Sequence, residues 1–422
     1  MKRAAILIFV VLAYAGCGEG GAGGQPQPLD GIPRYAVVSS DFSSSSIAML
    51  DESFDVLDES WINSGTTYPG LVATLSGDVV LPTEQSGDGT LTLIDRFFTD
   101  VITRFYVPSG NLSGQVRTHV ESGDGGFSSN PQDFVFVSPD SAWVPRYEPN
   151  LDPTALPQNR GTDLVEVDPS EMSLTGARID LSPLNTTAEV VTEAGTTEVE
   201  VFARPSRALL IGSRIVVGLD RISASFDASG PGMVAVVDLE DESVVGVELP
   251  NLRSCGHVTA VPGEAAKVVV ACAGFSQPFG DEAQIRASSG IAVLDASAPQ
   301  VQIERIWHAA DHPDAVIAVS GVVARDQERV WGVANGDFAT RVDTLQMIDL
   351  ANGQQRLVYE STGSFVVGQS AYDSERQMLF VPDAAANAVV ELAVDGDRIS
   401  PVGSTEIAPR LGLPPTQVYL LD

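Results

Sequence analysis

Short apolar strands that end in an acidic turn residue recur along this chain of 422 residues, and this repeat restricts the fold more than any other feature. The clearest unit runs from Tyr68 to Asp95. It predicts two short strands that meet at a Ser-Gly-Asp turn, then a Gly-Asp-Gly loop, then a third strand that ends at Asp95. Seven such third strands occur, six ending in Asp and one in Ala: residues 46–51, 90–95, 163–168, 233–238, 290–295, 344–349 and 388–393.

These third strands are apolar at nearly every position, as a sheet covered on both faces requires. Their terminal aspartates are predicted to be turn residues whose carboxylates accept backbone N–H groups. Two-stranded hairpins are predicted before six of them, at residues 68–83, 131–147, 204–219, 255–274, 319–335 and 367–383.

The seventh hairpin is divided between the two ends of the sequence. Residues 414–422 have the first-strand pattern without a following partner, and residues 34–40 have the second-strand pattern without a preceding one. Pairing them closes a ring. With a fourth strand in each unit, the sequence predicts an all-β, seven-bladed β-propeller of four-stranded blades. Two stacked β-sandwiches are the alternative, but they do not require complementary half-units at the ends.

The composition agrees with this fold and excludes one class of partner. With 39 Gly and 26 Pro, long helices are not expected. The net charge of -32 repels nucleic acid, so we expect none to bind, and it favours a soluble monomer.

The N-terminus has the pattern of a bacterial export signal. Residues 1–16 combine a basic start with an apolar run too short to cross a bilayer, and Ala15 and Gly16 precede Cys17. This pattern resembles the lipobox of bacterial lipoproteins, although Tyr14 stands where Leu is usual. The resemblance implies lipidation of Cys17, a Gly/Pro-rich tether over 17–33, and an envelope location that is periplasmic or surface-facing. The propeller that the repeat predicts then covers 34–422. Ordinary signal cleavage with secretion is the alternative.

The other two cysteines are predicted to form a disulfide. Cys255 and Cys272 stand symmetrically about Gly263 and Glu264, so a hairpin centred there places them on neighbouring strands. An extracytoplasmic location permits the bond. Two buried free thiols are the alternative.

Residues 69–83 and 130–147 share a Pro-led first strand, a short Ser- and Asp-containing turn and a second strand. This pattern resembles the YVTN-type or YncE-like seven-bladed propellers of bacterial envelopes, over about residues 34 to 422. The resemblance implies a blade architecture rather than an activity, because such propellers include ligand-binding lipoproteins, surface proteins and distant sugar-lactone hydrolases.

A propeller has two unequal faces. We call "plain" the face that carries the first-to-second and third-to-fourth strand turns, which are short in this sequence. We call "elaborated" the face that carries the second-to-third loops and the links between blades. The longer insertions are predicted on the elaborated face, and any binding site is expected there: residues 148–162, 221–232 and 275–289, and an extra hairpin over 188–201. In the opening unit, Ser-Gly-Asp is assigned to the plain face, and Tyr68 and the Gly-Asp-Gly loop to the elaborated face.

Six residues are candidates for contacting a ligand. Arg146 and Tyr147 lead into the first insertion, with packing of the Arg on the Tyr as the alternative. His257 begins an innermost strand and is either a general base or a hydrogen-bonding wall residue. His308 and His312 share one link with Asp311, either as metal ligands or as solvent-facing loop residues. Tyr68 completes the set.

No bound metal or cofactor is expected, with calcium or a transition metal as the alternative. Asp-Gly loops such as residues 86–90, 122–126 and 394–398 have suitable oxygen ligands, but none has the spacing of an EF-hand, and Asp-Gly pairs usually form turns. Five further acids are expected to line the elaborated face: Glu148, Asp152, Asp163, Asp281 and Asp337.

Motifs of serine hydrolases, phosphate-binding loops, haem sites and zinc proteases are absent from the sequence. The sequence therefore favours a membrane-anchored platform that binds an envelope protein, a peptide or a carbohydrate. The alternative is a lactonase-like hydrolase or lyase at the channel mouth, with His257 as base.

Overall fold

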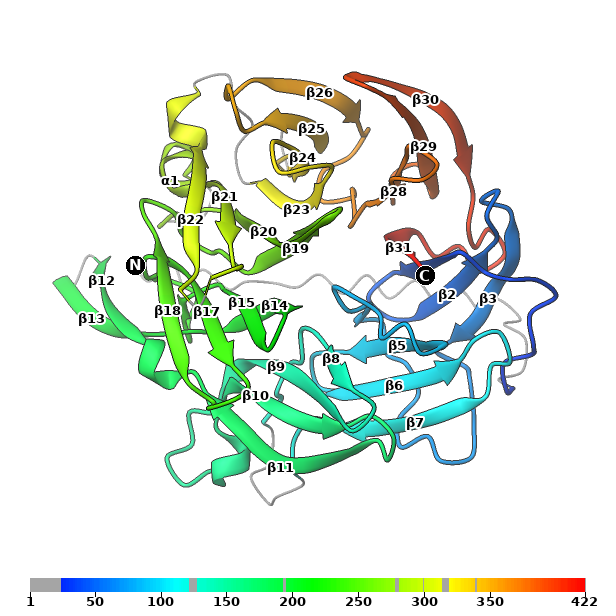
Figure 1. Ribbon diagram of the computed structural model, residues 1–422, viewed down its shortest axis with the longest axis horizontal. Helices are drawn as coiled ribbons and strands as arrows, with labels where there is room; N and C mark the ends of the chain where they lie inside the picture. The colour runs from blue at the N-terminus through cyan, green and yellow to red at the C-terminus, as the bar shows by residue number, and fades with distance from the viewer. Residues whose placement is uncertain are drawn as a thin grey trace, which may run out of the picture.

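The computed structural model describes residues 24–120, 127–192, 195–277, 281–298, 300–312, 319–337 and 340–421. In these ranges the chain forms seven four-stranded antiparallel sheets and one three-stranded sheet. The four-stranded sheets stand around a ring (Figure 1). The predicted all-β propeller is confirmed.

Each four-stranded sheet runs from an innermost strand to an outermost one. In the first sheet the order is β31 (Pro415–Leu420), β1 (Tyr35–Ser40), β2 (Ser45–Leu50) and β3 (Val56–Asn63). The second runs through β4 (Val79–Val80), β5 (Thr90–Asp95), β6 (Val101–Tyr106) and β7 (Leu112–Arg117). The third runs through β8 (Val135–Ser138), β9 (Ser141–Pro149), β10 (Gly161–Asp168) and β11 (Ser173–Asp180). The fourth runs through β14 (Pro205–Ile211), β15 (Arg214–Leu219), β17 (Gly232–Asp238) and β18 (Val244–Leu249).

The remaining three complete the ring in the same inside-to-outside order. The fifth holds β19 (His257–Val261), β20 (Glu264–Cys272), β21 (Gly290–Asp295) and β22 (Gln302–His308). The sixth holds β23 (Val319–Ala324), β24 (Arg329–Ala334), β25 (Thr344–Asp349) and β26 (Gln355–Glu360). The seventh holds β27 (Ala371–Asp373), β28 (Met378–Asp383), β29 (Ala388–Asp395) and β30 (Arg398–Thr405).

The C-terminal strand closes the ring as predicted. β31 pairs antiparallel with β1, with Tyr35 opposite Leu420, so the two ends of the sequence share one sheet. The core lies between neighbouring sheets, which explains why a strand such as β1 is buried at all six positions.

The unit from Tyr68 to Asp95 differs from its prediction. Val79 pairs with Asp95, so β4 is the first strand and residues 68–78 precede it instead of forming a hairpin with it. The strand at 90–95 is therefore second in its sheet, 101–106 is third, and β7 is the fourth. Consequently Ser-Gly-Asp lies in a link on the elaborated face and Gly-Asp-Gly in a turn on the plain face, the reverse of the prediction.

Contacts with Asp95 in its own sheet and with the preceding sheet explain this difference. Ser76 donates to the carboxylate of Asp95 from its backbone N (2.7 Å) and its hydroxyl (2.6 Å), and the Gly77 carbonyl accepts from the Ser40 hydroxyl at 2.5 Å. A Cβ on Gly77 would lie 2.2 Å from the backbone carbon of Phe42. The glycine is needed for close approach of two backbones, not for a hairpin turn.

Five of the six predicted turn aspartates act as turn residues. Backbone N–H groups two to four residues further on donate to Asp51, Asp168, Asp238, Asp295 and Asp349. The unit that ends in Ala393 turns later. Asp395 pairs with Arg398 across a two-residue loop in which Gly396 has a φ of 56°.

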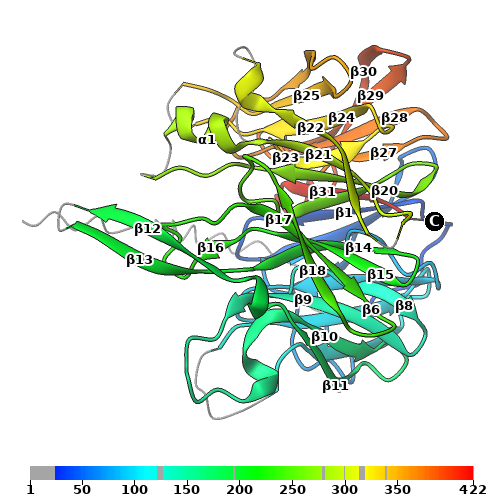
Figure 2. The ribbon, with the colours of Figure 1, turned by 60° about the vertical axis from the view of Figure 1, so that its left-hand side comes forward.

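Three further features stand on the ring. The extra hairpin is present as β12 (Thr186–Thr192) and β13 (Gly195–Phe202), joined by β16 (Ile222–Ser223) in the three-stranded sheet. It reaches beyond the ring on the side where helix α1 (Glu282–Ser288) lies (Figure 2). The described residues also include 3-10 turns at Pro157–Asn159, Ser182–Leu184 and Ala309–Asp311.

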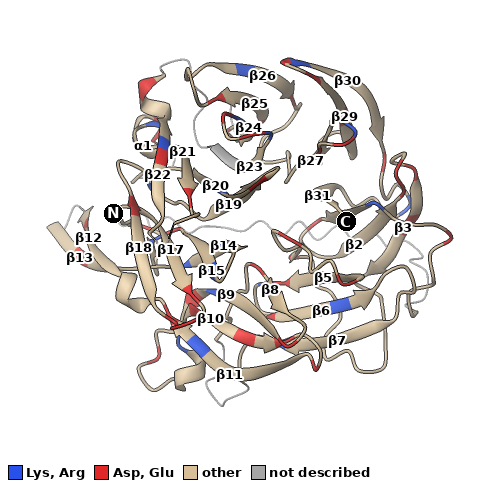
Figure 3. Cartoon of the chain, in the orientation of Figure 1, with Lys and Arg blue, Asp and Glu red and all other residues tan. Residues whose placement is uncertain are grey.

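The predicted disulfide joins Cys255 to Cys272. Acidic residues are distributed over strand ends and loops around the ring (Figure 3). In the described part of the chain, no helix has the length and apolar character needed to cross a membrane.

Candidate functional site

A groove on the elaborated face is formed by three of the four predicted insertions. Its volume is about 770 Å³. We call it the insertion groove; its lining comes from β12 (Thr187, Ala188, Glu189), the loop before β17 (residues 228–231), the link before β19 (residues 251–253), the segment after β20 (Phe275, Gln277) and α1 (Gln284, Ala287, Ser288).

Arg221 and Arg253 fix the 228–231 loop that lines this groove. Arg221 donates to the carbonyls of Pro231 and Leu184, both at 3.0 Å, and its own carbonyl accepts from Gly230 N. Arg253 donates to the carbonyl of Ser229. These bonds fix the 228–231 loop against the body of the ring, because a guanidinium satisfies several carbonyls at once.

Side chains of α1 fix a second wall. Asp281 caps the helix by accepting from Gln284 N at 3.1 Å. The Gln284 amide pairs with the backbone of Gln277 in both directions, at 3.0 and 3.1 Å. The Ser288 hydroxyl accepts from Phe275 N at 3.0 Å. An aromatic ring and several amides are thus held in place around the groove.

β12 forms a third wall. Its residues Ala188 and Val190 belong to a small apolar cluster with Val201 and Ala228, so the hairpin is fixed at its base to the 228–231 loop. The opposite face of the hairpin carries Glu189 directly across from Glu198, with the exposed Val191 two residues further along.

Next to the groove, Arg204 is enclosed by aromatic rings. Its guanidinium carbon lies 4.8 Å from the ring centre of Tyr147 and 4.3 Å from that of Phe226, and Nη1 donates to Glu148 at 2.7 Å. The Tyr147 hydroxyl bonds to Asp220, and burial raises the pKa of both groups. Tyr147 therefore contributes to an ordered polar cluster, with Arg204 rather than Arg146 stacked on it.

Arg146 lies inside the third sheet. It is fully buried and binds both carboxylate oxygens of Asp163 at 2.7 Å, and a third hydrogen bond goes to the carbonyl of Thr118. Arg178 also contacts Asp163. All these partners are internal, so the structure places Arg146 in the body beneath the elaborated face.

His257 lies near the axis of the ring. Its Nε2 is 3.3 Å from the carbonyl of Val322, on the next innermost strand. Burial, with a smaller contribution from Arg207, lowers the pKa of His257 to about 4, so the imidazole is neutral at pH 7. Arg207 crosses to two other sheets and donates to the carbonyls of Leu81 (2.8 Å) and Gln132 (3.0 Å).

The structure does not bring the other candidates to this place. Tyr68 donates to Asn111 at 3.2 Å, beside β7. His308 ends β22 opposite Gly290, and the ring of His312 stacks on Trp307 with centroids 5.4 Å apart. Among the residues that the structure describes, no group of three or more His, Cys, Asp or Glu is placed to hold a metal ion. Cys17 and residues 122–126 lie outside those residues.

The five acids expected on the elaborated face each have a local partner. Asp163 and Glu148 pair with arginines, and Asp281 caps α1. Asp152 accepts from Thr154 N, and Asp337 from Thr340 N and Arg341 N. Asp163 is fully buried in β10, so it does not line the elaborated face as predicted. The carboxylates of Asp152, Asp281 and Asp337 hold loops together.

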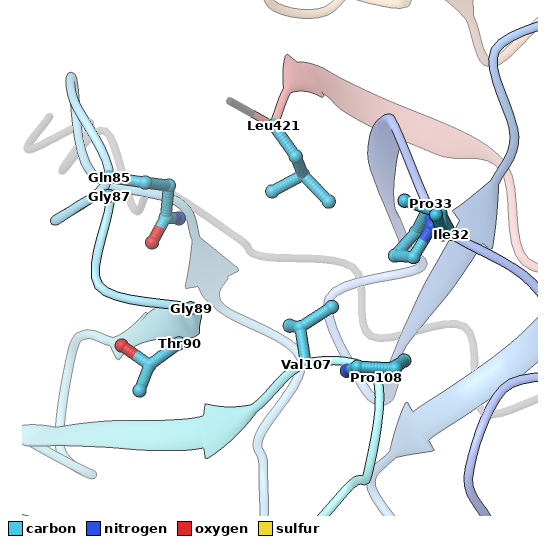
Figure 4. A pocket seen from close by; sticks show the side chains of 9 residues that line it. All are labelled: Ile32, Pro33, Gln85, Gly87, Gly89, Thr90, Val107, Pro108 and Leu421. Atoms are coloured by element: carbon cyan, nitrogen blue, oxygen red, sulfur yellow. The ribbon is translucent and has the colours of Figure 1, made fainter.

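A smaller pocket of about 220 Å³ lies on the plain face, between the first and second sheets. Figure 4 shows Leu421, Val107 and Pro33 around it, with Gln85 and Thr90 at one side. No predicted insertion contributes to it.

Sequence reasoning placed the insertions correctly but missed the residues that shape the groove. Arg221, Arg253 and Ser288 act through backbone carbonyls and N–H groups that are distant in sequence, so no local pattern marks them. One feature of the sequence could have marked Arg204: like Asn130, it stands directly before a proline that begins a first strand. In the structure both residues have a positive φ.

The chain resembles solved propellers in fold. No family model matches it, and no curated protein matches it in sequence. A structure described as a putative 6-phosphogluconolactonase from Bacteroides fragilis is 9% identical over 93% of this chain and 99% of that one, with a TM-score of 0.56. The periplasmic gluconolactonase of Pseudomonas aeruginosa is 11% identical over the same shares, with a TM-score of 0.55. A protein from Lactobacillus plantarum is 12% identical over 92% and 99%, with a TM-score of 0.50. At these identities the likeness establishes the propeller fold.

Proposed function

We propose that this protein is an envelope-anchored binding protein whose insertion groove takes a polar chain ligand, either a peptide or a carbohydrate. The observation that supports this most directly is the convergence of three separate insertions on one groove. A propeller body requires none of them, as the short turns of the plain face illustrate. Loops that meet on a rigid scaffold are the usual place for recognition.

The groove also has suitable chemistry. It combines the Phe275 ring with the amides of Gln277 and Gln284 and the charges of Arg253 and Glu189. Ligand sites commonly pair an aromatic surface with a few fixed polar groups. Since Gln284 and Ser288 hold this wall in place, binding would require little reordering.

Glycan and peptide arrays probed with the full chain test the proposal. We expect a ligand whose binding falls at least tenfold in Phe275→Ala and is unchanged in Tyr106→Ala, which removes an exposed aromatic ring from the plain face. If every ligand found binds the Phe275→Ala protein as tightly as the original, the groove is not the site.

The envelope location is part of the proposal. We propose lipidation at Cys17 and membership of the YVTN-type propellers, on the N-terminal pattern and the repeat. Cys17→Ser should move the protein from the membrane pellet to the soluble fraction. Retention in the pellet would contradict the anchor.

A second candidate is lactone hydrolysis near the axis. It is supported by the names of two structural neighbours and by a neutral imidazole, His257, close to Arg207. Release of acid from gluconolactone, monitored by pH-stat, should then depend on His257 and be lost in His257→Gln. Equal rates with and without the protein would exclude this candidate for that substrate.

A further inference from the structure

We propose that the insertion groove binds an extended peptide of alternating basic and apolar residues, which pairs with the free edge of β12. The inference rests on the proposed binding function of the groove and names its ligand. It is drawn from the backbone, the charge and the packing of the hairpin β12–β13.

The edge of β12 offers unpaired backbone groups to the groove. In the described part of the chain, β12 pairs with β13 alone. Every second residue of an edge strand directs its N–H and C=O away from its partner. Thr187 and Glu189 are two residues apart, and both line the groove. An incoming strand therefore finds a ladder of donors and acceptors at the spacing of a peptide backbone.

The polar face of the hairpin calls for positive charge. Glu189 stands opposite Glu198, and Glu200 follows two residues along on the same face; all three are exposed. Opposed like charges destabilise a strand pair. Residues 186–202 contain no Lys or Arg, and no ion pair involves these three acids within the described ranges. A lysine or arginine on an added strand would lie beside Glu189 and relieve the repulsion.

The other face of the hairpin is mainly apolar near its base, although Thr197 lies opposite Val190 on it. Ala188 and Val190 pack with Val199, Val201 and Ala228. Side chains of an added strand alternate between the two faces, so every second ligand residue meets this cluster. The hairpin thus selects basic residues at one set of positions and apolar residues at the other.

Charge also disfavours the other occupants of this edge. A second copy of the chain would bring another row of glutamates to the first, in a protein with a net charge of -32. A carbohydrate lacks the regular donor and acceptor spacing that β12 presents. An extended basic peptide satisfies both the backbone and the charge.

Calorimetric titration of the full chain with a defined probe tests the inference. The probe is a blocked octapeptide of alternating lysine and valine. Its control alternates lysine and proline, which keeps the charge and an extended shape but removes half of the backbone donors. We expect the lysine–valine peptide to bind at least tenfold more tightly than the control. Equal binding of the two would overturn strand pairing.

Protein variants test the charge contribution. The double variant Glu189→Gln/Glu198→Gln should bind the lysine–valine peptide about tenfold more weakly. The matched double variant Glu240→Gln/Glu264→Gln removes two exposed acids from turns of the plain face and should leave binding unchanged. An equal loss in both would mean that only net charge matters, and would overturn the inference.

Hydrogen exchange gives a readout on the unaltered protein. Bound peptide should slow exchange in β12 relative to β30, the outer strand of another sheet. Unchanged exchange in β12 at saturation would contradict edge pairing, whether or not the variants fold. A glycan that requires Phe275, with no lysine–valine binding, would overturn this inference and leave the proposed function standing.

Discussion

The two faces of the ring are built by different means. On the plain face, strands are joined by short turns in which an aspartate carboxylate accepts hydrogen bonds from backbone N–H groups of the residues that follow it. Asp168, Asp238 and Asp349 are examples. On the elaborated face, the loops around the insertion groove are also held by arginines that reach other segments, Arg221 to the Leu184 carbonyl and Arg253 to the Ser229 carbonyl.

This difference separates what the repeat determines from what the insertions add. A turn closed within four residues folds in the same way wherever its sequence occurs. A loop held by a distant arginine has its shape only once the body has formed. In the proposed function, recognition belongs to the face whose geometry depends on the whole fold, and stability comes from the body that both faces share.

The largest expected effect would come from breaking the body beneath the elaborated face. Arg146→Met leaves the buried carboxylate of Asp163 with Arg178 as its remaining charged partner. Removing one member of a buried ion pair typically costs about 3–5 kcal/mol. We expect a loss of this size in the free energy of unfolding measured with urea. Arg398→Met, an exposed change in β30, serves as control and should cost less than about 0.5 kcal/mol. Similar costs for the two would mean that the buried pair does not support the face.

Reducing the disulfide should have the next largest effect. Cys255 and Cys272 are separated by 17 positions, and a crosslink over such a loop stabilises by about 3 kcal/mol in the chain-entropy description. In Cys255→Ala/Cys272→Ala, the free energy of unfolding measured with urea should be lower by that amount. Adding a reductant should not change the stability of this double variant further. A reductant effect of the same size in the double variant would assign the loss to something other than this bond.

Much of this architecture can be predicted from the sequence because its determinants are local. The hairpins at 204–219 and 255–274, the ring closure and the extra hairpin follow from strand patterns and turn residues. The exception is instructive: Ser76-Gly77-Asp78 has the composition of a turn, but Gly77 is required by the backbone of Phe42 in another sheet.

The candidate site was less predictable for the same reason. Positions of the insertions are visible in the sequence, whereas their convergence depends on the angle between sheets. The role of Arg146 was open in the sequence because its partner, Asp163, is seventeen residues away on the neighbouring strand. Burial, which decides between a ligand contact and an internal pair, is a property of the folded ring.

An effect of intermediate size is expected from His257, near the axis of the ring. The pKa of His257 is lowered to about 4 in the folded protein, from about 6.5 in an unfolded chain. Between these values the unfolded state binds more protons, so stability should fall as the pH falls from 6.5 to 4, by about 2 kcal/mol after allowance for solvent at the axis. Other groups titrate in this range, so the measurement is the difference between the original protein and His257→Gln. A difference that is independent of pH would contradict a depressed pKa.

The smallest effect on the free energy of unfolding is expected on the plain face. It tests most directly whether the plain face contributes to stability but not to ligand binding. Asp349→Ala removes an acceptor for Ala351 N (2.9 Å) and Asn352 N (3.2 Å) in an exposed turn, where water can replace it. We expect a loss of about 1 kcal/mol in the free energy of unfolding. Asp395→Ala, at the glycine-containing turn before β30, removes an equal charge and should cost less. Both variants should bind any groove ligand as the original protein does, because the body between the faces is unchanged. Weaker ligand binding in Asp349→Ala alone would show that the two faces are coupled through the sheets, and would contradict the proposal that only the elaborated face takes part in binding.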